Sequence, residues 1–178
     1  MYAITECTSL PAGFDSLFNQ SQPILEAGTF DWRYLGSPAD DNTKRAKMRE
    51  EYEGYLGQAN TKVVYWEKDG HPIHVAAGLI TPDDDSYILW AYALYGSDAN
   101  GSKNWLYDTA YIEKTREFFQ STLSLAGYKV ACHKDSSIYN HHMDQDRASG
   151  YYEATLESTA HAEVDDSITV ATIKCRYL

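Results

Sequence analysis

The residues best suited to bind a ligand lie between an aromatic-rich segment and an amphipathic one. Residues 86–95 are rich in aromatic and aliphatic side chains, and the loop that follows contains Gly96 and Gly101. Where such a loop leads into a helix, several backbone N–H groups have no partner within the helix and can hold a pyrophosphate. We therefore expect a phosphate-bearing ligand at this loop.

A second group of reactive side chains lies between residues 132 and 146. Its side chains of metal-ligand type are Cys132, His133, His141, His142, Asp144 and Asp146. Adjacent histidines point in different directions on a helix or a strand, so His141 and His142 rarely reach one ion. The stretch also lacks HxxxH and HExxH spacings, which favours a solvated polar loop over a metal site.

The cysteines do not indicate a disulfide, a structural metal site or a catalytic nucleophile. Cys7, Cys132 and Cys175 are an odd number of widely separated residues with no CxxC spacing, which argues against a disulfide scaffold and a zinc ribbon. Cys132 and Cys175 fall in predicted strands, where a buried thiol behaves as a small apolar side chain.

Length and charge narrow the class of protein. The chain has 178 residues, which suits a single domain over residues 1–178 with one hydrophobic core. Its net charge of −11 makes nucleic acid an improbable partner, because nucleic-acid binding depends on Lys and Arg that neutralise phosphates. An acidic surface favours cationic partners such as amines, or it serves solubility alone.

No targeting segment is visible in the sequence. The first residues have neither a basic start nor an apolar run of signal-peptide length, and no segment approaches the ~20 apolar residues of a membrane span. We expect a soluble, cytoplasmic protein without membrane contact.

The ligand loop needs a sheet and helices to position it, and residue patterns predict both. Strands are predicted at residues 2–8, 61–68, 71–80, 86–95, 128–133, 151–156 and 167–175. Asp69-Gly70 is a strong hairpin signal, so residues 61–95 should form an antiparallel meander. The strand, helix, strand order around residues 86–133 predicts one parallel pair.

Three helices are expected, with a further short helix or loop at residues 135–149. Phe14, Leu17 and Phe18 mark a short first helix, and the signals from residue 37 to Gly57 mark a second. A third should follow the glycine loop, with Gly127 in a left-handed conformation at its end. The apolar stripe of this third helix is Trp105, Ile112, Phe119, Leu123 and Ala126.

This order of elements resembles the GNAT N-acetyltransferase superfamily over nearly the whole chain. The resemblance implies an α/β (α+β) fold, with a mixed, largely antiparallel sheet of six to seven strands flanked by three to four helices. In that family the loop after the fourth strand binds the pyrophosphate of acetyl-CoA through backbone amides, with the pattern Gln/Arg-x-x-Gly-x-Gly/Ala. Here Gly101 keeps the first glycine, while Asp98 replaces Gln or Arg and Lys103 replaces Gly or Ala.

The resemblance also implies which residues bind acetyl-CoA or another acyl-CoA as co-substrate. They are Leu94, Gly96, Asn100, Gly101, Ser102, Lys103 and Asn104. Family members commonly carry an Asn-led helix before the sixth strand, with a tyrosine that protonates the CoA thiolate. Asn140 and Gly150 fit that frame, and Tyr139 is the candidate acid, although the family places its tyrosine about four residues before the glycine.

A general base is needed because acetyl transfer to an amine removes a proton from the ammonium. The family often uses a carboxylate on the fourth strand, but residues 87–95 contain no Asp or Glu. Glu67, His74 and Asp85 are the neighbouring candidates, and His74 has a suitable ordinary pKa.

The acceptor is expected to be a small-molecule or protein amine. By resemblance, Trp32 and Tyr34 line its pocket together with Tyr92 of the fourth strand, although the same aromatic residues serve equally well to anchor a loop or to form a protein interface. The leading hypothesis is therefore an acyl-CoA-dependent N-acyltransferase that works by direct attack of the amine. The alternative is a GNAT-fold protein without catalysis that acts in binding or assembly, for example a phage virion or host-interaction component. A homodimer or another protein assembly is left open.

Overall fold

The computed structural model describes most of the chain. The described residues are 1–27, 40–81, 84–134, 152–161 and 169–178, with the single residues Tyr139, Met143, Gly150 and Ser167. Its helices are α1 (Phe14–Ala27), α2 (Asp41–Leu56) and α3 (Thr109–Ser121), and a 3₁₀ turn, η2 (Asn104–Tyr107), precedes α3. Its strands are β1 (Tyr2–Glu6), β2 (Thr61–Lys68), β3 (His71–Ile80), β4 (Tyr87–Tyr95), β5 (Gly127–His133), β6 (Tyr152–His161) and β7 (Thr169–Tyr177). Within these ranges, no helix is long and apolar enough to cross a membrane.

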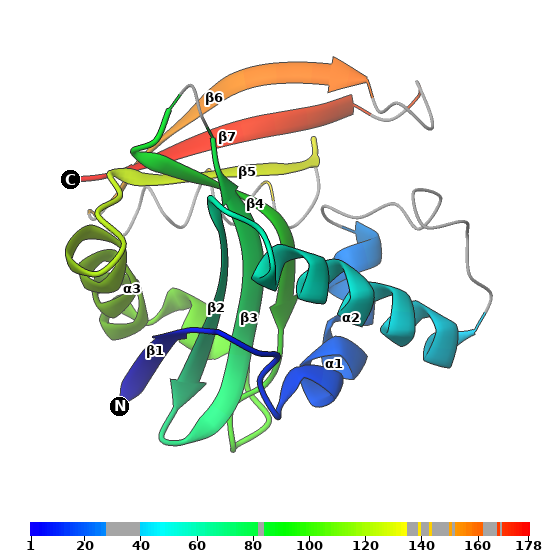
Figure 1. Cartoon of the computed structure of the whole chain (residues 1–178). Helices are drawn as coiled ribbons and strands as arrows, with labels where there is room; N and C mark the ends of the chain where they lie inside the picture. Colours follow the sequence, from blue (N-terminus) through cyan, green and yellow to red (C-terminus); the bar gives the residue numbers. More distant parts are fainter. Residues whose placement is uncertain are drawn as a thin grey trace.

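The strands form one mixed sheet in the order β1-β2-β3-β4-β5-β7-β6. Neighbouring strands are antiparallel except for β4 and β5, which run parallel and are joined through α3. In Figure 1, α3 lies on one side of the sheet, and α1 and α2 lie on the other. The predicted fold class, with its largely antiparallel sheet and three to four flanking helices, is confirmed.

The sheet separates two clusters of buried apolar side chains. The α3-side cluster includes Trp66, Trp90, Trp105, Ile112 and Phe119. The helix-pair cluster, beneath α1 and α2, consists of Phe14, Leu17, Phe18, Met48, Tyr52, Val63, Val75, Ala77 and Leu94. Strand β3 contributes to both, because successive side chains of a strand point to opposite faces: Ala76 belongs to the first cluster, and Val75 and Ala77 to the second.

Local sequence signals account for the turn between β2 and β3 and for the ends of α2. Asp69 and Gly70 both have positive φ, 51° and 79°, as a two-residue type I′ hairpin turn requires. At the start of α2, the Asp40 side chain accepts a hydrogen bond from the Thr43 N–H, and Gly57 caps the other end. The predicted meander and the predicted stop of α2 are therefore confirmed.

The third helix differs from the prediction at both ends. Trp105 lies in η2 rather than in the helix, because Asp108 has an extended backbone that starts α3 one residue later. The helix ends at Ser121, and Gly127 is the first residue of β5 rather than a helix cap. A Cβ at Gly127 would lie 2.0 Å from the Cys175 carbonyl oxygen and 2.9 Å from the Tyr87 ring, so this glycine is needed for close approach of strands.

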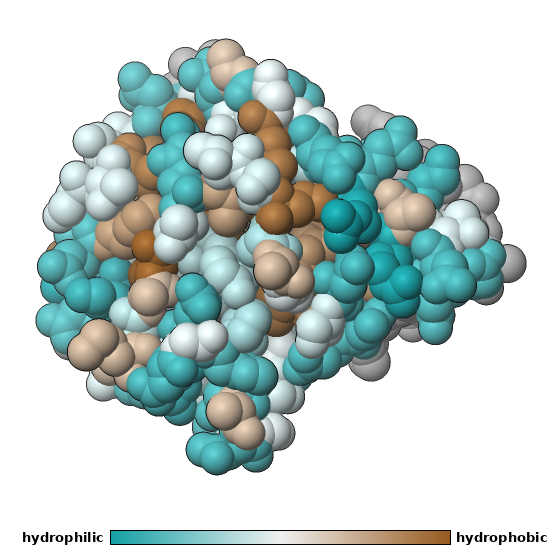
Figure 2. All heavy atoms as spheres, turned by 60° about the horizontal axis from the view of Figure 1, so that its bottom comes forward, coloured by the Kyte–Doolittle hydropathy of each residue, from teal (hydrophilic) through white to brown (hydrophobic). Residues whose placement is uncertain are grey.

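The first helix is longer than predicted, since α1 runs from Phe14 to Ala27. Its first half supplies Phe14, Leu17 and Phe18 to the helix-pair cluster, as their spacing predicted. The view in Figure 2 shows a surface that is largely hydrophilic, with apolar side chains visible in narrow bands.

The contact at Gly127 gives a test of the sheet. Gly127→Ala should lower the free energy of unfolding by at least about 2 kcal/mol, because backbone atoms crowd the new methyl group. Gly54→Ala is the matched control: its Cβ meets nothing closer than 4.0 Å, and it should stabilise α2 by about 0.5–1 kcal/mol. Urea unfolding measures both, and equal stability of Gly127→Ala and the wild type would contradict the strand packing described here.

Candidate functional site

The strands β4 and β5 pair over only part of their length. Their register starts with Tyr87 opposite Gly127 and ends with Trp90 opposite Val130, while β4 continues to Tyr95. Beyond Val130, β5 stays paired with β7 on its other side. In Figure 1, β5, β7 and β6 lie across the direction of β2 and β3, so the sheet turns at this junction. The second half of β4 thus has an edge that β5 does not cover.

A β-bulge coincides with the point where the strands part. On β3, Ala77 lies opposite Tyr92 and Gly78 opposite Trp90, so Ala91 is an extra residue in β4. The bulge changes which face the side chains reach: Trp90 belongs to the α3-side cluster, whereas Tyr92 packs against the helix-pair cluster. A Cβ at Gly78 would lie 2.7 Å from the Trp90 ring, so glycine allows the close packing beside the bulge.

Side chains from other elements take up the carbonyl groups at the end of β4. The Tyr52 hydroxyl donates to the Tyr92 carbonyl at 3.3 Å, and the Ser21 hydroxyl donates to the Tyr95 carbonyl at 2.9 Å. The Trp105 indole N–H donates to the carbonyl of Gly96 at 3.0 Å. Three backbone acceptors in this region are therefore paired within the chain.

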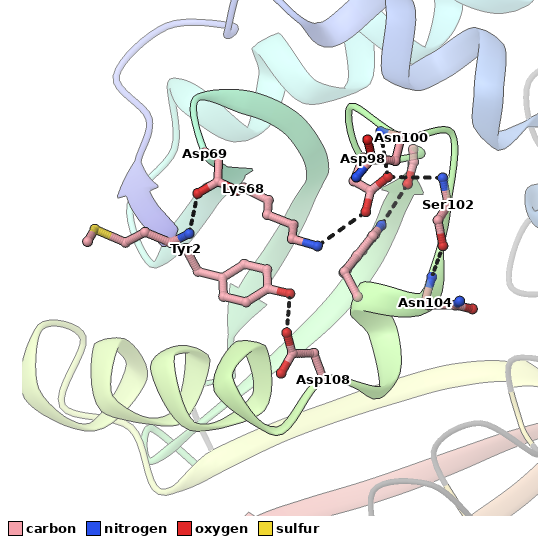
Figure 3. A network of polar contacts seen from close by, with 11 residues as sticks. Tyr2, Lys68, Asp69, Asp98, Asn100, Ser102, Asn104 and Asp108 are labelled. Carbon is pink, nitrogen blue, oxygen red and sulfur yellow. Dashed lines mark hydrogen bonds and ion pairs between the residues drawn. The ribbon is translucent and has the colours of Figure 1, made fainter.

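The loop after β4 is organised around the carboxylate of Asp98. One carboxylate oxygen accepts hydrogen bonds from the N–H groups of Asn100, at 2.9 Å, and Ser102, at 3.0 Å. The other oxygen accepts from the Lys68 ammonium at 3.2 Å, and the Asp98 side chain is only 7% exposed. Figure 3 shows Lys68 reaching Asp98 from the β2–β3 hairpin.

The remaining contacts of the loop are also internal. The Gly101 N–H donates to the Asp98 carbonyl at 3.0 Å, and the Asp98 N–H donates to the Ser102 carbonyl at 2.8 Å. The Ser102 hydroxyl accepts from the Asn104 N–H at 3.1 Å. Gly101 has a φ of +75°, and a Cβ there would meet nothing within 4 Å, so this tip faces open space.

Helix α1 holds the loop from its other side. The Gln20 side chain accepts a hydrogen bond from the Ser97 N–H at 2.7 Å, and the Gln20 carbonyl accepts from the Lys103 ammonium at 3.3 Å. A Cβ at Gly96 would lie 2.6 Å from Leu17. Burial lowers the pKa of Lys103 below its usual value. Lys103 thus anchors the loop to α1 in this structure.

The N-terminus of α3 already holds a carboxylate. Asp108 accepts a hydrogen bond from the Ala110 N–H at 3.0 Å and one from the Tyr2 hydroxyl at 2.7 Å. Burial, followed by the hydrogen bond to Asp108, raises the pKa of Tyr2 well above its usual value, so the hydroxyl remains the donor. The helix end is therefore capped and separated from the glycine loop by η2.

The hydrogen-bond donors around Asp98 can be compared with those that a diphosphate group needs. Two amides and an ammonium surround an anionic group, which is the donor set that binds phosphate oxygens. The Asp98 carboxylate is a stand-in for such an anion. The donors are therefore of the kind that binds an anion, and in this structure the Asp98 carboxylate occupies them.

Each candidate base comes from a different part of the sheet. His74 is buried in the α3-side aromatic packing, stacked on Trp66 at 4.2 Å and near Tyr95 at 4.5 Å between ring centroids, with Nδ1 3.1 Å from the Tyr111 hydroxyl. Glu67 lies on β2, with β3 between it and β4. Asp85 precedes β4, at the end opposite the loop. Their roles remain predictions.

The other predicted residues are in mixed positions. Tyr139 is partly buried against the α3-side cluster, and Leu94 is fully buried in the helix-pair cluster. Trp32 and Tyr34 lie outside the described residues, as do His141 and His142. In the part of the chain that the structure describes, no three His, Cys, Asp or Glu side chains could hold a metal ion together. Cys132 and Cys175 are buried in their strands.

The structure places a carboxylate next to Tyr92 that no residue pattern indicated. Glu51 of α2 accepts a hydrogen bond from the Tyr92 hydroxyl at 3.2 Å. Burial, and then the nearby Glu51 carboxylate, raise the pKa of Tyr92 well above its usual value, so Tyr92 stays protonated at neutral pH. The only sequence signal was the position of Glu51 next to the buried Tyr52 in α2. Glu51 thus brings a negative charge to Tyr92, two residues beyond the last β4–β5 pair.

No protein-family model and no curated protein matches this chain. Solved structures do match it. A spermidine N-acetyltransferase from Vibrio cholerae, in complex with CoA and spermine, is 8% identical with a TM-score of 0.63, and the match covers 97% of this chain and 94% of that one. An acetyltransferase from Salmonella typhimurium that modifies the N-terminal serine of the 50S ribosomal subunit protein L7/L12 is 11% identical, with a TM-score of 0.62 and coverage of 99% and 95%.

A third structure is an acetyltransferase of the GNAT family from Streptococcus pneumoniae. It is 12% identical, with a TM-score of 0.52, and the match covers 98% of each chain. At such identities the similarity concerns the fold. It confirms the architecture that the resemblance in the sequence implied.

The contacts of Asp98 predict a dependence of stability on pH. Hydrogen bonding by the Ser102 amide, with the Lys68 contact and the Asn100 amide, holds the pKa of Asp98 below its usual value. Its stabilising effect is complete above the unfolded-state pKa, near 4, and is lost as the pH falls through the lower folded-state pKa. Urea unfolding between pH 6 and pH 2.5 should therefore show a smaller acid-induced loss for Asp98→Asn than for the wild type. Parallel curves for the two proteins would contradict this assignment.

Proposed function

This chain has the fold of the GNAT N-acetyltransferases, and we propose that it is an acyl-CoA-dependent N-acyltransferase that acts on an amine. The observation that carries the proposal is the parting of β4 and β5 at the Ala91 bulge. It leaves an edge of β4 that β5 does not cover, directly before a loop with an anion-binding donor set. An extended pantetheine chain beside β4 would place the diphosphate at that loop.

The proposed reaction forms an amide bond and breaks a thioester bond. The neutral amine nitrogen attacks the thioester carbonyl, the thiolate leaves, and a proton passes from the nitrogen to a base. On the acceptor side, the Glu51 carboxylate with Tyr92 would attract an ammonium and take up its proton, directly or through water. Tyr139 remains our candidate for protonating the thiolate, and acetyl is the proposed acyl group.

Cationic amines are the proposed acceptors. The net charge of −11 favours them electrostatically. Two solved proteins with this fold point to amine probes: one is a spermidine N-acetyltransferase and another modifies an N-terminal serine. Spermidine and a peptide with a free N-terminal serine are therefore suitable first acceptors for an assay.

A second candidate function is a GNAT-fold protein that binds or assembles without catalysis. The observation that favours it is the internal pairing of backbone groups that a cofactor would use. The Ser21 hydroxyl donates a hydrogen bond to the Tyr95 carbonyl, and the Asp98 carboxylate accepts hydrogen bonds from two loop amides. A protein of this second kind would not need acyl-CoA at all.

Calorimetric titration with acetyl-CoA separates the two candidates. The wild type should bind saturably below millimolar concentration and release thiol when spermidine or the serine peptide is added. Gly101→Trp should bind at least about tenfold more weakly, because its φ of +75° disfavours any side chain and the bulk occupies the open face of the loop. Absence of saturable binding by a folded wild type at millimolar acetyl-CoA would rule out the transferase and favour the second candidate.

A further inference from the structure

The loop after β4 contains a complete anion site that is filled by the chain itself. The Asp98 carboxylate receives two backbone amides and one ammonium, and the side chain is 7% exposed. In Figure 3 the carboxylate lies between Lys68 on one side and the Asn100 and Ser102 amides on the other. These contacts come from two separate parts of the chain, the end of β2 and the loop itself.

The donors around Asp98 do not require a carboxylate in particular. Backbone amides of a tight loop and a lysine ammonium bind any compact oxyanion, and charge-assisted hydrogen bonds of this kind are stronger than neutral ones. A diphosphate carries more negative charge than one carboxylate and gains more from Lys68. The Asp98 carboxylate has the advantage of being tethered, which gives it a high effective concentration at the site.

We propose that Asp98 is an internal competitor for the diphosphate of the acyl-CoA, and that Lys68 passes from Asp98 to the ligand when the ligand binds. The inference rests on the proposed function in one respect, namely that acyl-CoA is the natural ligand. Asp98 thereby sets the affinity for the co-substrate and keeps the loop ordered without it.

The loop leaves room for this exchange. Ala99, Asn100 and Gly101 are exposed, and a Cβ at Gly101 would meet nothing within 4 Å. The exchange that we propose requires the Asp98 side chain to rotate away from the Asn100 and Ser102 amides, toward these exposed residues. Trp105 and Gln20 hold the start of the loop through Gly96 and Ser97, and the Lys103 ammonium holds its end through the Gln20 carbonyl.

The test compares CoA binding by Asp98→Asn and by the wild type. Asparagine retains an acceptor for the Asn100 and Ser102 amides but removes the charge that competes for Lys68. Asp98→Asn should bind CoA at least about tenfold more tightly. Asp69→Asn is the matched control, because it removes the same charge from the residue next to Lys68. In the wild type, Asp69 contacts the N-terminal ammonium and not the loop. Asp69→Asn should bind CoA as the wild type does.

Lys68 is tested in the background of Asp98→Asn. In the wild type, removing Lys68 would weaken both the binding of Asp98 to the loop and the binding of the diphosphate. The two effects on CoA affinity oppose each other, so the single variant is ambiguous. Adding Lys68→Met to Asp98→Asn should lower CoA affinity by about tenfold relative to Asp98→Asn alone. Unchanged affinity of the double variant would overturn the role of Lys68.

Inorganic pyrophosphate distinguishes failure of the inference from failure of the proposed function. If the wild type does not bind CoA but Asp98→Asn gains binding of pyrophosphate, Asp98 is a competitor and the transferase proposal fails. If folded Asp98→Asn binds CoA and pyrophosphate no better than the wild type, the inference is overturned. Asp98→Ser, whose hydroxyl can still accept from a loop amide, decides by the same criteria if Asp98→Asn does not fold.

Discussion

The pairing of backbone polar groups where β4 leaves β5 is the constraint on which the rest of this structure depends. Buried carbonyl and N–H groups must find partners, and beyond Trp90 the neighbouring strand no longer supplies them. Side chains from three other elements supply partners there: Ser21 of α1, Tyr52 of α2 and Trp105 of η2, the element that follows β4 in the chain. These contacts join both helices and η2 to the end of β4, in addition to the apolar packing beneath α1 and α2.

The same requirement links stability to ligand binding. Every backbone group that the chain satisfies internally is one that a ligand must compete for. At the loop the internal partner is a charged carboxylate, and at the end of β4 the partners are neutral hydroxyl and indole groups. At the loop, an anionic ligand would have to displace a carboxylate. At the end of β4, a ligand would replace a neutral hydrogen bond with another neutral hydrogen bond.

How far the sequence predicted this molecule depends on whether the cause of a feature is local. The Asp69-Gly70 turn and the end of α2 at Gly57 are set by adjacent residues, and they were predicted. The Ala91 bulge was not, because it depends on register against β3. Gly127 was misassigned for a different reason: a glycine serves either a positive φ or a close approach, and only the partner strand reveals which.

The candidate site was predictable only as a segment. Residues 96–104 were identified from their glycines and from the order of elements, and the structure places residues 96–103 in one loop, with Asn104 at the start of η2. The contacts that give the loop its chemistry join residues far apart in sequence: Lys68 to Asp98, and Glu51 to Tyr92. No spacing pattern encodes such pairs. Asp98 was recognised as a departure from the family pattern, but its burial and its partners were not foreseen.

The two hydrophobic clusters also differ in how their residues are distributed along the sequence. The helix-pair cluster draws all its buried members from residues between Phe14 and Leu94, whereas the α3-side cluster draws on residues from Tyr2 to Tyr177. Exchange of residues 14–94 in one piece would therefore carry every buried member of the helix-pair cluster, but it would leave out Cys7 and Leu10, which pack against them, and would also change Trp66 of the α3-side cluster. No single segment of that kind holds the α3-side cluster, because its buried members come from both ends of the chain as well as from its middle.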